Sequence, residues 1–152
     1  ARRVPGATLL DDQHAARTVV TRAAVPDERT DKGYLFRLIA AERADKAMQP
    51  FLFTAKRGEI TAGGLRHPGQ EFVHVLSGTV DYRVGATTWT LAAGDSLYFD
   101  SDEEHDVVPV SETATWLAIF HHPPAVANRR QNTDKTEATW ARKRPRISRP
   151  RS

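Results

Sequence analysis

Short stretches of alternating apolar and polar residues dominate the middle of the chain. Stretches with this β-type pattern lie at residues 34–39, 50–55, 72–76, 79–84, 87–91, 96–99, 106–110 and 114–120. Most of the breaks between them contain glycine or proline, which favour turns. Many short strands at such spacing predict an antiparallel sandwich or barrel, and the lack of alternating long helices argues against a parallel α/β fold. The pattern therefore predicts an all-β domain.

Three regions of different composition follow from this pattern. Residues 34–122 are the predicted barrel domain, in which residues 40–48 are expected to form a helical turn. Residues 1–33 are an irregular lead-in, and the β-branched stretch at residues 18–21 predicts one edge strand there. Residues 123–152 have few aliphatic side chains and much proline, arginine and lysine, so they cannot bury enough surface to offset chain entropy. We predict that this basic tail is disordered.

Composition limits the classes of protein to which the chain can belong. Its 152 residues correspond to one domain, and without a long apolar run no membrane partner is expected. The absence of cysteine excludes disulfides, thiolate metal sites and a cysteine nucleophile, and it fits a reducing compartment. The N-terminus has no signal-peptide pattern. We therefore expect a cytoplasmic protein.

The net charge of +3 is unevenly distributed along the chain. Residues 1–124 carry 13 Lys or Arg and 17 Asp or Glu, whereas residues 125–152 carry 9 and 2. An acidic barrel repels nucleic acid, so any such partner would bind the tail. The candidate contact residues there are Arg142, Lys143, Arg144 and Arg146. The alternative is a solvated tail without a partner.

Two histidines and a glutamate are the candidate metal ligands. His67 and Glu71 are separated by three residues that include a Pro-Gly turn, and a turn between strands can bring both side chains to one interior surface. His105 follows an acidic stretch near the end of the predicted barrel. Imidazole and carboxylate suit Fe, Mn, Ni or Zn, and two histidines with one carboxylate are typical of non-haem Fe(II) sites. The alternative is that these are solvated surface residues.

The segment at residues 65–107 resembles the two sequence motifs of the cupin superfamily. His67, Glu71 and Gly78 have the spacing of the first motif, with three residues between His and Glu and six between Glu and Gly. A Gly-Asp turn at residues 94–95 followed by His105 resembles the second motif. The resemblance covers about residues 34–122. It implies a double-stranded β-helix, the jelly-roll cupin barrel, with metal ligands at His67, Glu71 and His105.

Leu65 stands where the first motif of the superfamily usually has another histidine. An iron-dependent epoxidase of the superfamily uses such a reduced ligand set, whereas many cupins without that histidine bind no metal tightly. A bound divalent metal and a metal-free pocket therefore both remain open. Strand positions place Phe53, Leu65 and Phe99 in the predicted pocket wall.

Residues 48–53 and the two later motifs together show a narrower resemblance. They are similar to the sensor half of bacterial Xre-class regulators. Those proteins carry an N-terminal helix-turn-helix, and the first 33 residues here are too short and too interrupted by proline to hold one. The resemblance implies a domain that senses a small molecule or metal, with a DNA-binding half upstream of Ala1 or none in a free-standing relative. The rival is a metal-dependent oxygenase, isomerase or lyase, and a third alternative is a structural barrel with an empty pocket.

The open edges of a jelly roll predict a homodimer, because unpaired backbone groups at a sheet edge need a partner. The predicted edge strand at residues 18–21 is expected to add to the partner's sheet. Trp89, Tyr98 and Trp116 lie on predicted strands and are assigned to the core or to an interface. His74 is assigned to the surface or to the dimer interface.

Overall fold

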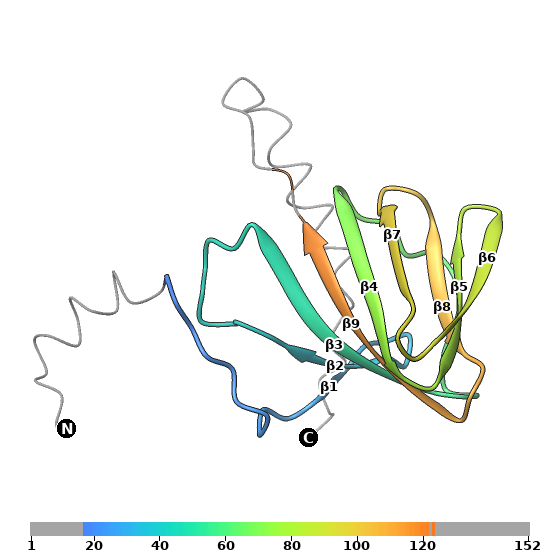
Figure 1. The fold of residues 1–152 in the computed structure, drawn as a ribbon, viewed down its shortest axis with the longest axis horizontal. Helices are drawn as coiled ribbons and strands as arrows, with labels where there is room; N and C mark the ends of the chain where they lie inside the picture. The colour runs from blue at the N-terminus through green and yellow to red at the C-terminus, as the bar shows by residue number, and fades with distance from the viewer. Residues whose placement is uncertain (1–16, 122, 124–152) are drawn as a thin grey trace, which may run out of the picture.

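Nine β-strands make up the regular structure of residues 17–121 and 123, the part of the chain that the computed structural model describes (Figure 1). They are β1 (Glu28–Arg29), β2 (Leu35–Leu38), β3 (Met48–Lys56), β4 (Gln70–Ser77), β5 (Thr79–Val84), β6 (Thr87–Ala92), β7 (Ser96–Asp100), β8 (His105–Pro109) and β9 (Thr113–His121). The described residues contain no helix, and hence none that is long and apolar enough to cross a membrane. The all-β prediction is confirmed, with β2 to β9 at the predicted positions.

The strands form two antiparallel sheets whose inner faces share one core. The larger sheet has the order β1-β2-β3-β9-β4-β7 and the smaller has the order β6-β5-β8. Strands distant in sequence are neighbours, since β3 pairs with β9 from Met48 opposite His121 to Lys56 opposite Thr113. Figure 1 shows the smaller sheet beside the β4 and β7 end of the larger one. This strand order is that of a jelly roll rather than of a simple meander.

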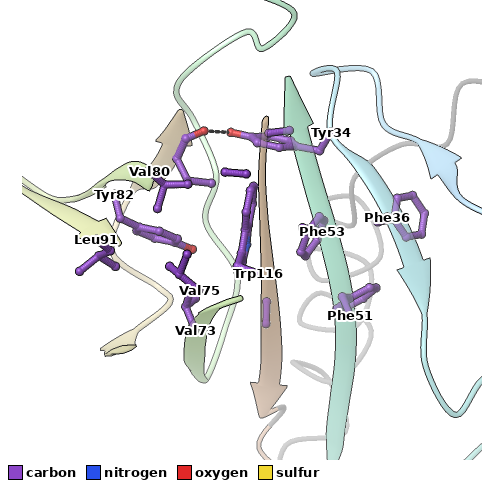
Figure 2. Packing of buried hydrophobic residues seen from close by; sticks show 14 of the residues in the cluster. Tyr34, Phe36, Phe51, Phe53, Val73, Val75, Val80, Tyr82, Leu91 and Trp116 are labelled. Atoms are coloured by element: carbon purple, nitrogen blue, oxygen red, sulfur yellow. Dashed lines mark hydrogen bonds between the residues drawn. The ribbon is translucent and has the colours of Figure 1, made fainter. Parts of the chain in front are cut away.

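Large aromatic side chains fill the space between the sheets. Phe53 of β3 stacks on Trp116 of β9 with ring centroids 5.7 Å apart, and Tyr34 meets Trp116 edge-on at 6.1 Å (Figure 2). Tyr82 of β5 enters the same core from the smaller sheet. Rings bury more apolar area than most aliphatic side chains, so they dominate the free energy gained by closing the barrel.

Two glycines permit the close backbone approaches on either side of β4. Gly69 has φ +102°, and a Cβ there would lie 2.0 Å from the carbonyl oxygen of His121. Gly78 has φ +75°, and a Cβ there would lie 2.3 Å from the carbonyl oxygen of Thr113. Only glycine fits at such positions. This explains physically why Gly78 ends the histidine-containing motif.

The predicted edge strand at residues 18–21 is wrong. These residues form no strand, and the edge of the larger sheet is β1, where Glu28 lies opposite Phe36. β-Branched residues favour a strand only when a partner edge is available. Here the hydroxyl of Thr21 accepts a hydrogen bond from the backbone N–H of Ala40 at 2.8 Å instead.

The predicted helical turn at residues 40–48 is also wrong. Residues 40–47 contain bends and hydrogen-bonded turns, and β3 begins at Met48. Ala40 has φ 56°, which is incompatible with a right-handed helical turn at that residue. The predicted disordered tail lies outside the described residues except for Pro123.

Candidate metal centre

Three buried side chains from separate parts of the barrel converge in its interior. His67 precedes β4, Glu71 is the second residue of β4, and His105 is the first residue of β8. Glu71 shares the inward face of β4 with Val73 and Val75, because alternate residues of a strand point to the same side. The structure thus brings the three sequence-predicted ligand residues together.

Backbone hydrogen bonds connect the segments that carry the two histidines. The N–H of Leu65 donates to the carbonyl of His105 at 3.1 Å, and the N–H of His105 donates to the carbonyl of Leu65 at 2.9 Å. The N–H of His67 donates to the carbonyl of Ser101 at 2.9 Å. The loop before β4 is therefore held against the segment that leads into β8.

The donor atoms lie close enough to share one ion. Nε2 of His67 is 3.0 Å from Oε2 of Glu71, and Nε2 of His105 is 3.5 Å from the same oxygen. One ligand atom from each residue lies within 4.8 Å of the others. Bonds of about 2.0–2.2 Å place neighbouring ligands of one metal ion roughly 3–3.5 Å apart. The spacing and the donor types therefore fit a divalent transition-metal ion.

A hydrogen bond orients His105 toward the other two donors. Its Nδ1 donates to the carbonyl oxygen of Glu103 at 2.8 Å, so its Nε2 carries the free lone pair. Burial lowers the pKa of His105 below its usual value. The ring is therefore neutral at physiological pH, which is the form that binds a metal.

Tyr82 holds the carboxylate of Glu71 from the other side. Its hydroxyl donates to Oε1 of Glu71 at 3.1 Å, while Oε2 faces the two histidines. Burial, reinforced by the charge of Glu71, raises the pKa of Tyr82 well above its usual value. Tyr82 therefore stays protonated and remains a hydrogen-bond donor.

Packing orients His67. Its Nδ1 is buried and has no hydrogen-bond partner among the described residues. The ring stacks on Phe120 with centroids 4.3 Å apart, and it meets the ring of His105 edge-on at 5.3 Å. Aromatic contacts and the hydrogen bond between its Nε2 and Oε2 of Glu71 thus fix the orientation of the ring.

A cavity of about 40 Å³ adjoins the three donors. Its lining residues are Tyr34, Phe53, Leu65, His67, Glu71, Tyr82, His105, Val107, Trp116 and Phe120. Two of the predicted wall residues, Phe53 and Leu65, are among them. The third, Phe99, does not line the cavity; its ring packs against His105 at 4.9 Å and Tyr82 at 5.5 Å.

Sequence reasoning missed part of the cavity wall. The residues not predicted to line it are Tyr34, Tyr82, Val107, Trp116 and Phe120. Strand alternation could have found Tyr82, because it shares the buried face of β5 with Val80 and Val84. No local pattern signals Tyr34, which lies between β1 and β2 and reaches the cavity through the fold.

His74, Trp89 and Tyr98 are not among the residues that line the cavity, whereas Trp116 is. Nδ1 of His74 is 2.7 Å from Oγ of Ser96 at an exposed position. Trp116 belongs to the core, whereas Trp89 is 42% and Tyr98 62% exposed. The predicted nucleic-acid contacts Arg142, Lys143, Arg144 and Arg146 lie outside the described residues.

Comparison with known families identifies the class of this barrel. Residues 51–120 match the family described as Cupin domain. The matched segment contains His67, Glu71 and His105 as well as the Gly78 turn. The chain therefore carries a cupin domain, as its motifs indicated. No curated protein matches the chain in sequence.

Solved structures share the fold at low sequence identity. An HTH_3 family transcriptional regulator from Vibrio cholerae matches with a TM-score of 0.57 at 24% identity, over 64% of this chain and 57% of that one. Hydroxypropylphosphonic acid epoxidase from S. wedmorenis matches with a TM-score of 0.57 at 18% identity, over 68% and 58%. An RmlC-like cupin from Shewanella frigidimarina NCIMB 400 matches with a TM-score of 0.57 at 16% identity, over 72% and 92%. This chain spans less than two thirds of the length of the first two proteins.

Proposed function

We propose that this cupin domain binds a divalent transition-metal ion through His67, Glu71 and His105 and senses a small molecule that reaches the ion from the adjoining cavity. The observation that carries the proposal is a buried triad, at most 5% exposed, in which both histidine Nε2 atoms lie within 3.5 Å of one carboxylate oxygen. A buried carboxylate is costly unless it is paired or bound to a metal. In the structure this pairing is the hydrogen bond between Glu71 and Nε2 of His67 at 3.0 Å, together with the one from Tyr82. An ion would replace the first of these bonds and bind Nε2 of both histidines as well.

The protein residues would hold the ion from one side. Such an ion supplies open coordination positions at which a small molecule replaces water. Glu71 contributes the negative charge, and Tyr82 keeps one oxygen of that carboxylate engaged so that the other faces the ion. The neutral ring of His105 contributes a lone pair whose direction is set by its bond to Glu103.

Sensing is the role that we favour for this site. The similarity to an HTH_3 family transcriptional regulator supports it. A ligand regulates only if it binds one conformation or assembly state more tightly than another. A regulatory role also requires a DNA-binding segment or partner outside the described barrel, so the ligand-binding step is the part that this domain would perform.

A metal-dependent enzyme is the second candidate function. The similarity to hydroxypropylphosphonic acid epoxidase, which is an enzyme by name, favours it. In that case the same triad would hold the ion and the cavity would hold the substrate. Product formation by the metal-loaded protein during a substrate screen distinguishes the enzyme from a sensor, which binds its ligand unchanged.

The proposed site predicts about one divalent ion per chain and a strong dependence on His105. His105→Ala removes one of the three ligands, so we expect the affinity for Fe, Ni, Mn or Zn to fall by at least about 100-fold. Plasma mass spectrometry of untagged protein gives the metal content, and calorimetric titration gives the affinity.

His74→Ala is the matched control for this substitution. His74 lies on β4 at an exposed position beside Ser96, away from the triad, so its loss is expected to leave metal affinity unchanged. Unchanged affinity in the His105→Ala variant would contradict the proposal. The same holds if none of these metals binds at micromolar concentration.

A further inference from the structure

We infer that the ligand of this site is a small molecule with one metal-binding group and a short apolar body. The inference rests on the proposed metal site. Once the two histidines and the carboxylate hold an ion, the rest of the wall is made by other side chains. These are Tyr34, Phe53, Leu65, Tyr82, Val107, Trp116 and Phe120, all of them aromatic or aliphatic.

The hydroxyl groups of this wall are already used inside the protein. Tyr34 donates to the backbone carbonyl of Val107, a bond that is drawn in Figure 2, and Tyr82 donates to Glu71. Burial raises the pKa of both tyrosines, so both hydroxyls keep their protons in these bonds. Apart from the indole N–H of Trp116, the wall then offers no side-chain group that could replace the water lost by a polar ligand group.

The charges around the cavity disfavour a second anionic group on the ligand. A bound divalent ion would offset the charge of Glu71, but the rest of the wall is largely aromatic, and the faces of aromatic rings carry partial negative charge. Arg83, next to Tyr82 in sequence, is paired with Asp106 at 2.6 Å. Lys32 donates to the carbonyl of Gly63 at 2.6 Å. Neither cation is among the residues that line the cavity.

The volume of the cavity limits the length of the apolar body. One water molecule needs about 10–15 Å³ of such space. The cavity of about 40 Å³ therefore has room for roughly three water-sized groups beside the donors. A chain of a few carbon atoms fills this space, whereas a sugar or a nucleotide would extend out of it toward solvent.

Leu65 is the wall residue at which this selectivity can be reversed. It is half-buried, and hydrogen bonds to His105 hold its backbone in place. A lysine at this position can keep its stem against the apolar wall while its ammonium group reaches water or a ligand. Leu65→Lys therefore adds a cation at the cavity without burying it completely.

Three acids with the same coordinating group test the inference on the full-length protein loaded with Co²⁺. Visible absorption of the cobalt ion follows titration with acetate, butyrate and succinate. We expect butyrate to bind at least about threefold more tightly than acetate, because its extra methylene groups are buried. Succinate is expected to bind at least about tenfold more weakly than butyrate, because its second carboxylate loses water and no cation lines the cavity to pair with it.

Leu65→Lys is expected to reverse the order of butyrate and succinate, since the ammonium group pairs with the second carboxylate. Val110→Lys adds the same charge at a 43% exposed position outside the cavity and is expected to preserve the order. If the Leu65→Lys variant does not fold, the titrations of the unchanged protein with acetate, butyrate and succinate test the inference without it. Succinate binding as tightly as butyrate to that protein would overturn this inference alone. Failure to take up cobalt would overturn the proposed function, and the inference with it.

Discussion

At the scale of single residues, the two oxygens of Glu71 have different partners. Oε2 faces Nε2 of His67 and of His105, and Oε1 accepts the hydroxyl of Tyr82. The side chain is only 3% exposed, so water cannot replace these partners readily. This division leaves one oxygen for an ion and holds the other in place. Tyr82 is thus a positioning residue that acts through Glu71.

Tyr82→Phe removes the hydroxyl and keeps the ring. We expect the affinity for Co²⁺ to fall about 10- to 100-fold, because the carboxylate is no longer held in one orientation. The visible spectrum of bound cobalt is also expected to change, since Oε1 becomes free to approach the ion. Absorption titration measures both the affinity and the spectrum.

Tyr34→Phe is the control for that experiment. It removes a hydroxyl from the same cavity wall, but this hydroxyl donates to the carbonyl of Val107 and not to Glu71. We expect an unchanged cobalt spectrum in this variant. If both variants alter the spectrum equally, the hydroxyl of Tyr82 has no specific role in positioning Glu71.

Leu65→His is expected to strengthen metal binding by about tenfold or more, because it adds an imidazole to the ligand set. Leu65 lines the cavity, lies two residues before His67 and forms a backbone bridge with His105. The imidazole of the variant is therefore expected to enter the cavity beside the two histidines. Calorimetric titration with Zn²⁺ measures the change, and Val110→His adds the same group outside the cavity. A flat or lower affinity would show that position 65 does not reach the ion.

At the scale of elements, pairing between β5 and β8 sets the position of His105. Val84 lies opposite His105, and on the outer face Arg83 donates to Asp106 at 2.9 and 2.6 Å. A slip by one residue would turn either His105 or Tyr82 to the outer face, because side chains alternate along a strand. The site therefore depends on the register of the smaller sheet as much as on the donors themselves.

The turn between β4 and β5 provides a second test at this scale. Gly78→Ala is expected to cost about 3 kcal/mol of unfolding free energy or more, because it adds backbone strain to a collision with the carbonyl of Thr113. Gly94→Ala is the matched control, since Gly94 has φ +93° and no atom would lie within 4 Å of a Cβ there. Its cost is expected to be only about 1–2 kcal/mol. Equal losses in chemical denaturation would show that crowding at Gly78 is unimportant.

At the scale of the whole molecule, the described part of the chain leaves most of its outer strand edges unpaired. The larger sheet ends in β1 and β7, and the smaller ends in β6 and β8. On adjacent strands of the larger sheet, Leu76 is 51% and Tyr98 62% exposed. Exposed edges and apolar side chains of this kind favour association. Binding of nucleic acid by the tail and a cytoplasmic location also stay predictions at this scale.

We expect the protein to be a homodimer in solution. Two-fold pairing is the commonest way to cover such edges and apolar side chains. Because residues 18–21 form no strand, we expect edge pairing by the described residues to use the observed edge strands instead. Light scattering at tens of micromolar measures the mass, and a monomer at that concentration would refute the expectation.

The alternation of apolar and polar residues was sufficient to predict most of the strands, but residue type alone was not sufficient to predict the structure of the lead-in. Residues 79–84 were predicted from alternation and coincide with β5, because a strand with one buried face imposes that alternation on its sequence. Residues 18–21 have strand-forming side chains and yet form no strand, and β1 rather than this stretch ends the larger sheet. Whether a stretch finds a partner edge depends on the rest of the fold.

The sequence by itself determined the strand pattern and the identities of the candidate donors, because alternation and motif spacing are local properties of the chain. Only the tertiary structure decided what surrounds those donors. Tyr34 and the carbonyl that it contacts are 73 residues apart, and Tyr82 meets Glu71 from the other sheet. Such side chains meet only after sheet order and register have been set, and neither is encoded in a short stretch of sequence.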